Sequence, residues 1–97
     1  MNIHVLVAAR QDLEDGFEFY EQQKPGIGEY FLRTPQAEIA SLDGHAGVHS
    51  RCFGHYYRML SGRFPFAVYY RIEQDTILID AVLDCRRDPS RLQTRLS

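Results

Sequence analysis

The sequence predicts an α+β domain in the order β-α-α-β-β-β, with two N-terminal helices packed on one face of a small antiparallel sheet. Apolar residues recur at helical spacing over residues 10–23 and 27–42, and the period changes to two after residue 54. The connections between the later segments are too short for crossovers. With 97 residues, the chain has room for one modest core. We therefore expect a single domain over residues 1–97, with a polar tail from about residue 89.

The N-terminal segment predicts a strand and then a helix. Residues 3–8 are apolar on both faces and rich in β-branched side chains, which is typical of a strand buried by helices. After them Leu13, Phe17 and Tyr20 recur at steps of four and three, and acidic residues fill most of the other positions. This pattern predicts an amphipathic helix that ends before Pro25, because proline cannot continue the helical hydrogen-bond ladder.

A second helix is predicted from Ile27 to about Leu42, where apolar residues again share one face. Pro35 lies inside this segment. We therefore expect a kink or a fresh helical start, with Thr34 as the N-cap and Glu38 complementing the helix start.

The second half of the chain predicts a loop and an antiparallel meander. Residues 41–49 contain two glycines and several polar residues, which favours a loop. Three segments with strand-like alternation follow, joined by short turns, over residues 54–60, 64–72 and 76–85.

Alternation along the later strands assigns side chains to faces. In the middle strand one set faces one way: Phe66, Val68, Tyr70 and Ile72. The other set faces away from it: Ala67, Tyr69 and Arg71. In the last strand the predicted inward set is Ile77, Ile79, Ala81, Leu83 and Cys85, and Asp80 and Asp84 are predicted to point outward. The face without helices is expected to be partly polar.

The net charge of −2 argues against a strongly basic nucleic-acid binder, but the charge is unevenly distributed. Residues 1–48 carry three cations against eight acidic residues, whereas residues 49–97 carry eight arginines against five acidic residues. Arginine favours planar, bidentate contact with carboxylate or phosphate. The second half is therefore where we expect the functional surface.

Arginines on the predicted meander are the main functional signal. Neighbouring strands are expected to bring several of them into one cationic patch that binds a target or a partner: Arg58, Arg63, Arg71, Arg86 and Arg87. The alternative is a set of exposed charges in weak salt bridges with nearby carboxylates: Glu73, Asp80, Asp84 and Asp88. The sequence leaves both interpretations open.

Other chemical motifs are weak. His45, His49, Cys52 and His55 have a spacing that could hold zinc, but exposed loop histidines are the commoner arrangement, so we expect no metal and no cofactor. The tyrosines beside the arginines either stack bases or pack in the sheet. Phosphate-binding glycine motifs and nucleophile elbows are lacking in the sequence. Apolar runs are too short to span a membrane and the start is unlike a signal peptide, so we expect a cytoplasmic protein.

Several stretches in order resemble the RelE/ParE superfamily of toxins from bacterial type II toxin–antitoxin modules, the plasmid stabilisation protein family. The first is the helix signature over residues 9–20. The later ones are Tyr56-Tyr57-Arg58-Met59-Leu60, then Phe64-Pro65-Phe66 before an apolar strand, and finally Arg86-Arg87-Asp88-Pro89. Together the resemblance covers about residues 3–90.

The resemblance implies a toxin that arrests growth and is neutralised by a cognate antitoxin. Such an antitoxin wraps the toxin with an acidic, initially disordered C-terminal segment, and its N-terminal domain binds operator DNA. The toxin would then contact operator DNA only through the antitoxin, and no membrane partner is implied.

The resemblance implies one of two targets. ParE-like toxins inhibit DNA gyrase and are not enzymes, whereas RelE-like toxins are mRNA interferases that cleave mRNA on the ribosome. This chain has no lysine after Lys24, and Asp84 stands where a histidine is often found. A carboxylate there would repel a scissile phosphate, so the ParE-like branch is favoured. If the chain is instead a ribosome-dependent endoribonuclease, the candidate catalytic residues are Arg58, Arg71, Arg86, Tyr57 and His49.

Overall fold

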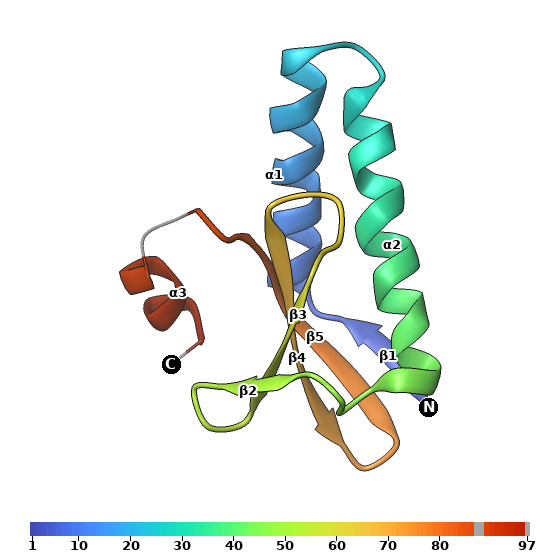
Figure 1. The fold of residues 1–97 in the computed structure, drawn as a ribbon, viewed down its shortest axis with the longest axis vertical. Helices are drawn as coiled ribbons and strands as arrows, with labels where there is room; N and C mark the ends of the chain where they lie inside the picture. The colour runs from blue at the N-terminus through green and yellow to red at the C-terminus, as the bar shows by residue number, and fades with distance from the viewer. Residues whose placement is uncertain (87–88, 97) are drawn as a thin grey trace.

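A computed structural model describes residues 1–86 and 89–96 (Figure 1). The elements follow the chain as β1 (Asn2–Val5), α1 (Val7–Gln23), α2 (Ile27–His45), β2 (Ser50–Cys52), β3 (Tyr56–Leu60), β4 (Phe66–Glu73), β5 (Thr76–Asp84) and α3 (Pro89–Leu96). The α+β class and the two N-terminal helices before a meander are as predicted. The short strand β2 and the docked helix α3 are additions to the predicted order.

The sheet has the order β1-β5-β4-β3-β2. Its later strands pair antiparallel, as predicted, but β1 pairs parallel with β5, so the sheet is mixed. Strand β1 was expected to be buried by helices. It lies instead at the edge of the sheet, where Ile3 and Val5 are half-buried and Asn2 and His4 are exposed. None of the described helices is both long and apolar enough to cross a bilayer.

The helical hairpin is closed by a carboxylate at its tip. The side chain of Glu21 on α1 accepts hydrogen bonds from the backbone N–H groups of Gly26 and Gly28, at 3.1 and 3.0 Å. These groups belong to the start of α2, whose dipole favours a negative charge. At Gly28 a Cβ atom would lie 2.7 Å from the carbonyl oxygen of Phe17. Glycine there allows the two helices to approach closely.

Helix α2 continues through Pro35, so no fresh helix starts there and Thr34 is not an N-cap. Pro35 is fully buried. Burial of its ring offsets the backbone hydrogen bond that proline removes. The helix also extends to His45, so the first part of the predicted 41–49 loop is helical.

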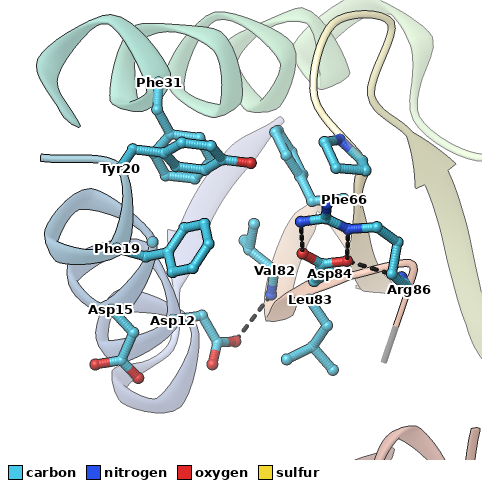
Figure 2. A pocket seen from close by; sticks show the side chains of 12 residues that line it. Asp12, Asp15, Phe19, Tyr20, Phe31, Phe66, Val82, Leu83, Asp84 and Arg86 are labelled. Carbon is cyan, nitrogen blue, oxygen red and sulfur yellow. Dashed lines mark hydrogen bonds and ion pairs between the residues drawn. The ribbon is translucent and has the colours of Figure 1, made fainter. Parts of the chain in front are cut away.

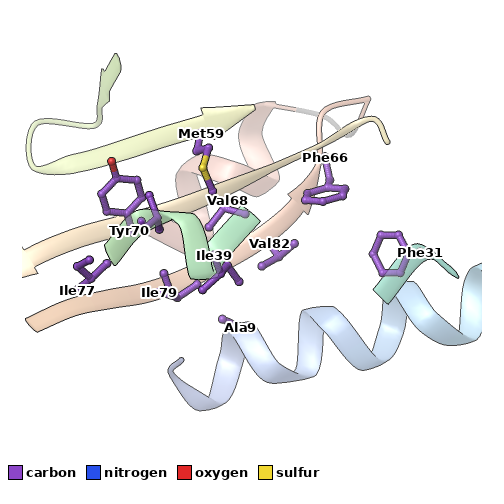
Figure 3. Close-up of a cluster of buried hydrophobic side chains, with 11 residues drawn as sticks. Ala9, Phe31, Ile39, Met59, Phe66, Val68, Tyr70, Ile77, Ile79 and Val82 are labelled. Carbon is purple, nitrogen blue, oxygen red and sulfur yellow. The ribbon is translucent and has the colours of Figure 1, made fainter. Parts of the chain in front are cut away.

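The main core lies between the helical hairpin and one face of the sheet (Figure 3). Phe66, Val68 and Tyr70 of β4 point into it, as the alternation predicted. They meet Phe31 and Ile39 from α2.

A β-bulge between β4 and β5 reverses the predicted faces at the end of β5. Tyr69 pairs with Ala81 and Tyr70 with Ile79, so Asp80 is the extra residue. Ile77 and Ile79 face the helices as expected, but after the bulge it is Val82 that joins the main core. Ala81 and Leu83 belong to the opposite face, and Cys85 is exposed, so their inward assignment was wrong.

The face of the sheet away from the hairpin carries a second, smaller core. Ala67, Tyr69 and Ala81 are buried there with Leu96 of α3, and Leu92 of α3 packs against them. This face was expected to be partly polar. Polar groups are present, but α3 covers the apolar centre.

Candidate functional site

A groove of about 260 Å³ opens between α1, the start of β4 and the end of β5 (Figure 2). Aromatic and aliphatic side chains form most of its walls, and three carboxylates and one guanidinium lie among them. The lining residues are Asp12, Asp15, Gly16, Phe19, Tyr20, Phe31, Pro65, Phe66, Val82, Leu83, Asp84 and Arg86.

Close packing of aromatic rings shapes the inner wall of the groove. Tyr20 stacks on Phe31 with ring centroids 4.8 Å apart, and Phe31 meets Phe66 edge to face at 5.6 Å. Gly16 makes room for this arrangement, because a Cβ atom there would lie 2.6 Å from the Phe31 ring. Phe19 stands at the mouth and is 50% exposed. An exposed aromatic ring at an apolar groove offers contact area to a binding partner.

Two of the charged groups in the groove, Asp84 and Arg86, form an ion pair with one another. Arg86 donates to both carboxylate oxygens of Asp84, at 3.0 and 2.7 Å (Figure 2). The hydrogen bond with Asp84 raises the pKa of the Arg86 guanidinium. Asp84 therefore faces the helix side of the sheet rather than pointing outward, a second consequence of the bulge. An apolar wall with a polar rim suits binding of a partner's side chains.

The structure places Arg58 and Arg71 on the sheet face away from the hairpin. Arg58 donates to the hydroxyl of the buried Tyr69 at 3.2 Å and approaches Cys85 Sγ at 3.9 Å. Burial raises the pKa of Tyr69, and the hydrogen bond from Arg58 partly opposes this. Arg71 makes a bidentate pair with Asp80, at 2.8 and 3.1 Å, and also donates to Glu73 at 2.8 Å.

Arg63 and Arg86 do not join this face. Arg63 lies in the β3–β4 turn and donates to the Tyr30 hydroxyl at 3.3 Å. Arg86 lies at the groove, and Arg87 is outside the described residues. The predicted single cationic patch is thus divided between separate places. The alternative interpretation foresaw the partners Glu73, Asp80 and Asp84 correctly, whereas Asp88 is also outside the described residues.

His49 and Tyr57 lie together near β2, at the buried Tyr70. The Tyr70 hydroxyl accepts the N–H of Gly47 at 3.0 Å and lies 2.5 Å from His49 Nδ1. Which of the two groups donates in this contact depends on the tautomer of the imidazole ring. Tyr57 stacks on Tyr70, and the guanidinium of Arg51 covers Tyr57 at 5.0 Å. Arg51 was not among the predicted site residues, although its place opposite Tyr57 follows from the register.

The histidine and cysteine series does not gather into a metal site. Within residues 1–86 and 89–96, no three His, Cys, Asp or Glu side chains are placed to hold a metal ion. His45 instead lies at the end of α2, with its ring against the carbonyl of Ser41.

Comparisons with known proteins identify the fold. No family model matches the sequence, and no curated protein matches it either. Among solved structures, a chain of the chromosomal ParDE toxin–antitoxin system from P. aeruginosa superposes with a TM-score of 0.82. The two sequences are 17% identical, and the match covers 87% of this chain and 95% of that chain. The architecture is that of an α+β domain with a helical hairpin on a meander. More particularly, it is a ParE-like fold, as the sequence resemblance implied.

Proposed function

We propose that this protein is the toxin of a type II toxin–antitoxin module, which arrests growth and is neutralised by a cognate antitoxin. The observation that carries the proposal is the shared fold with a ParDE chain over 95% of that chain's length. The apolar groove beside α1, with Phe19 half-exposed at its mouth, supports it as a place for a protein partner.

We further propose that the toxin acts by inhibiting DNA gyrase and is not itself an enzyme. Cleavage of RNA by its own 2′-hydroxyl needs cations and a proton-transfer group close to one phosphate. The candidate residues for that reaction are dispersed. Tyr57 of β3 pairs with Tyr70, near the end of β4, whereas Arg86 lies beyond Asp84, which pairs with the first residue of β4, Phe66. The charges of Arg71 and Arg86 are already compensated by carboxylates. This dispersal favours a binding inhibitor over the ribosome-dependent mRNA endoribonuclease.

Three measurements test the proposal. Induction in cells that lack the antitoxin should arrest growth, and the purified protein should inhibit DNA supercoiling by gyrase. In the same cells, the 5′ ends of ribosome-bound mRNA should be unchanged within minutes of induction. New ends at codon positions would reassign the protein to the mRNA interferases, and unimpaired growth would overturn the toxin assignment itself.

A further inference from the structure

A second cleft, here called the hairpin cleft, lies between the two long helices. Its volume is about 500 Å³, and all of its lining residues belong to α1 and α2. They are Arg10, Leu13, Glu14, Phe17, Glu18, Leu32 and Gln36. The hairpin cleft shares no lining residue with the groove, and the proposed function leaves it unused.

Apolar side chains in and beside the hairpin cleft are only partly covered. Leu13 and Phe17 of α1 and Leu32 of α2 are half-buried there. Val7 lies on the same side of α1, because it precedes Glu14 by about two helical turns, and its side chain is 82% exposed. A partner that covers these side chains removes apolar surface from water, which favours association.

Three charged side chains form a row along α1 at this cleft. Arg10, Glu14 and Glu18 follow one another at intervals of four positions, so they share one face of the helix. All three are exposed, and within residues 1–86 and 89–96 none of them belongs to an ion pair. Their charges are therefore available to opposite charges on a partner.

The order of side chains along this face of α1 is complementary to itself when the helix is reversed. Arg10 and Glu14 lie two positions before and after residue 12, and Val7 lies five positions before it. Phe17 lies five positions after it. Where two copies of a helix run antiparallel about a two-fold axis, each position lies level with the position equally far from the axis on the other side. An axis level with residue 12 therefore places Arg10 beside Glu14 of the second copy. The same axis places Val7 beside Phe17 of the second copy, and the symmetry repeats both contacts.

We propose that the hairpin cleft is the interface of a symmetric homodimer, in which the α1 helices of two copies pack antiparallel. A second copy supplies both signs of charge in the order that this face requires, together with apolar side chains for the cleft. A peptide or nucleic acid with charges of one sign would meet either Arg10 or the glutamates as like charges. Glu18 lies level with the uncharged Leu6 of the second copy rather than with a carboxylate. The inference concerns the chain alone and does not rest on the proposed function.

Sedimentation equilibrium of the purified full chain tests the homodimer. At concentrations from about 1 μM to about 1 mM the wild type should show a monomer–dimer equilibrium. In R10E and in E14R, two attractive contacts of the dimer become repulsive, because the two-fold axis repeats each contact. Each variant should therefore dimerise about tenfold or more weakly. The double variant R10E/E14R exchanges the two charges and should dimerise as the wild type does.

A mixture of the two single variants separates contacts between copies from effects within one chain. R10E carries two negative charges at these positions and E14R carries two positive charges, so an equimolar mixture should form heterodimers more tightly than either variant forms homodimers. R33E is the matched control, since Arg33 is an exposed arginine of α2 that does not line the hairpin cleft. It should dimerise as the wild type does.

Three results would overturn the homodimer. The first is a wild type that stays monomeric at every concentration. The second is a dimer that R10E and E14R leave unchanged, and the third is an equal loss of dimer in R33E. If the wild type is monomeric and R10E instead weakens binding of the antitoxin, the hairpin cleft is assigned to that partner. Growth arrest is scored separately, so failure of the homodimer and failure of the toxin assignment are distinguishable.

Discussion

Asp12 on α1 and Arg95 on α3, 83 positions apart in the chain, form a two-point ion pair with distances of 2.9 and 2.8 Å. The same Asp12 carboxylate accepts the backbone N–H of Val82 at 2.9 Å. Strand β1 pairs with β5 only as far as Ile79, so Asp12 satisfies a donor of β5 beyond the end of that pairing. One carboxylate thus connects the helical hairpin, the sheet and the C-terminal helix.

Replacing Asp12 should destabilise the protein more than replacing Arg95. R95A leaves the Val82 bond in place and should lower the free energy of unfolding by about 1 kcal/mol. D12A removes both contacts and leaves the backbone N–H of Val82 without its acceptor. We therefore expect D12A to lower the free energy of unfolding by about 2–3 kcal/mol. Urea denaturation measures both. Equal losses would contradict the role of Asp12 as a junction.

Gly16 should tolerate no side chain, because a Cβ atom would lie 2.6 Å from the ring of Phe31. G16A is expected to shift Phe31 and to lower stability by about 1–3 kcal/mol despite alanine's higher helix propensity. G44A is the matched control, since Gly44 is also in a helix and nothing lies within 4 Å of its added Cβ. That variant should be neutral or more stable. Thermal unfolding of both variants decides, and a stable G16A would show that Phe31 adapts freely.

Buried tyrosines make the fold sensitive to alkaline pH. Burial raises the pKa of both Tyr69 and Tyr70 above the ordinary value of 10.0. Because the pKa of each tyrosine is higher in the folded state, the unfolded chain loses these protons at lower pH than the folded chain does. The stabilisation by the two protonated tyrosines is therefore complete below pH 10 and decreases as the pH rises through their folded-state pKa values. We expect urea midpoints to fall steeply above pH 10, and Y70F to fall less steeply. At neutral pH Y70F should lose about 1 kcal/mol, because the Gly47 N–H loses its acceptor. If the urea midpoints of wild type and Y70F fell equally steeply with pH, ionisation of Tyr70 would not be a cause of the alkaline destabilisation.

Periodicity predicted the two long helices and the middle strand because the residues of each that face the main core recur at a regular spacing. It failed at β5, where the extra residue Asp80 shifts later side chains to the other face. A bulge is set by pairing with the neighbouring strand and leaves no mark in the alternation of one strand. Helix α3 was missed as a docked element because, among its described side chains, two apolar residues that pack on the sheet, Leu92 and Leu96, are separated by polar ones. Its attachment depends on Asp12, a partner that lies far away in the sequence.

The arginines illustrate a second limit of prediction from the sequence, which concerns the partners of side chains. Arg71 and Arg86 were correctly seen as possible partners of nearby carboxylates, because those carboxylates are close in sequence or across one turn. Sequence proximity could not indicate that Arg63 lies beside Tyr30, 33 positions earlier. The sequence also could not indicate that Phe19 stays exposed. An apolar residue next to the core-facing side of a helix can be either buried or exposed.

Phe19 provides a test of the groove that leaves the fold intact. Because its side chain is 50% exposed and lies at the mouth of the groove, F19S should change stability by no more than about 0.5 kcal/mol. Under the proposed function, the antitoxin encoded beside this chain should bind F19S about tenfold or more weakly, because an aromatic anchor in a groove commonly contributes more than 1 kcal/mol. Calorimetric titration of the purified partners measures the affinity. V7S is the matched control, since Val7 is 82% exposed on the same helix and does not line the groove. Equal affinities for wild type, F19S and V7S would place the antitoxin elsewhere on the surface.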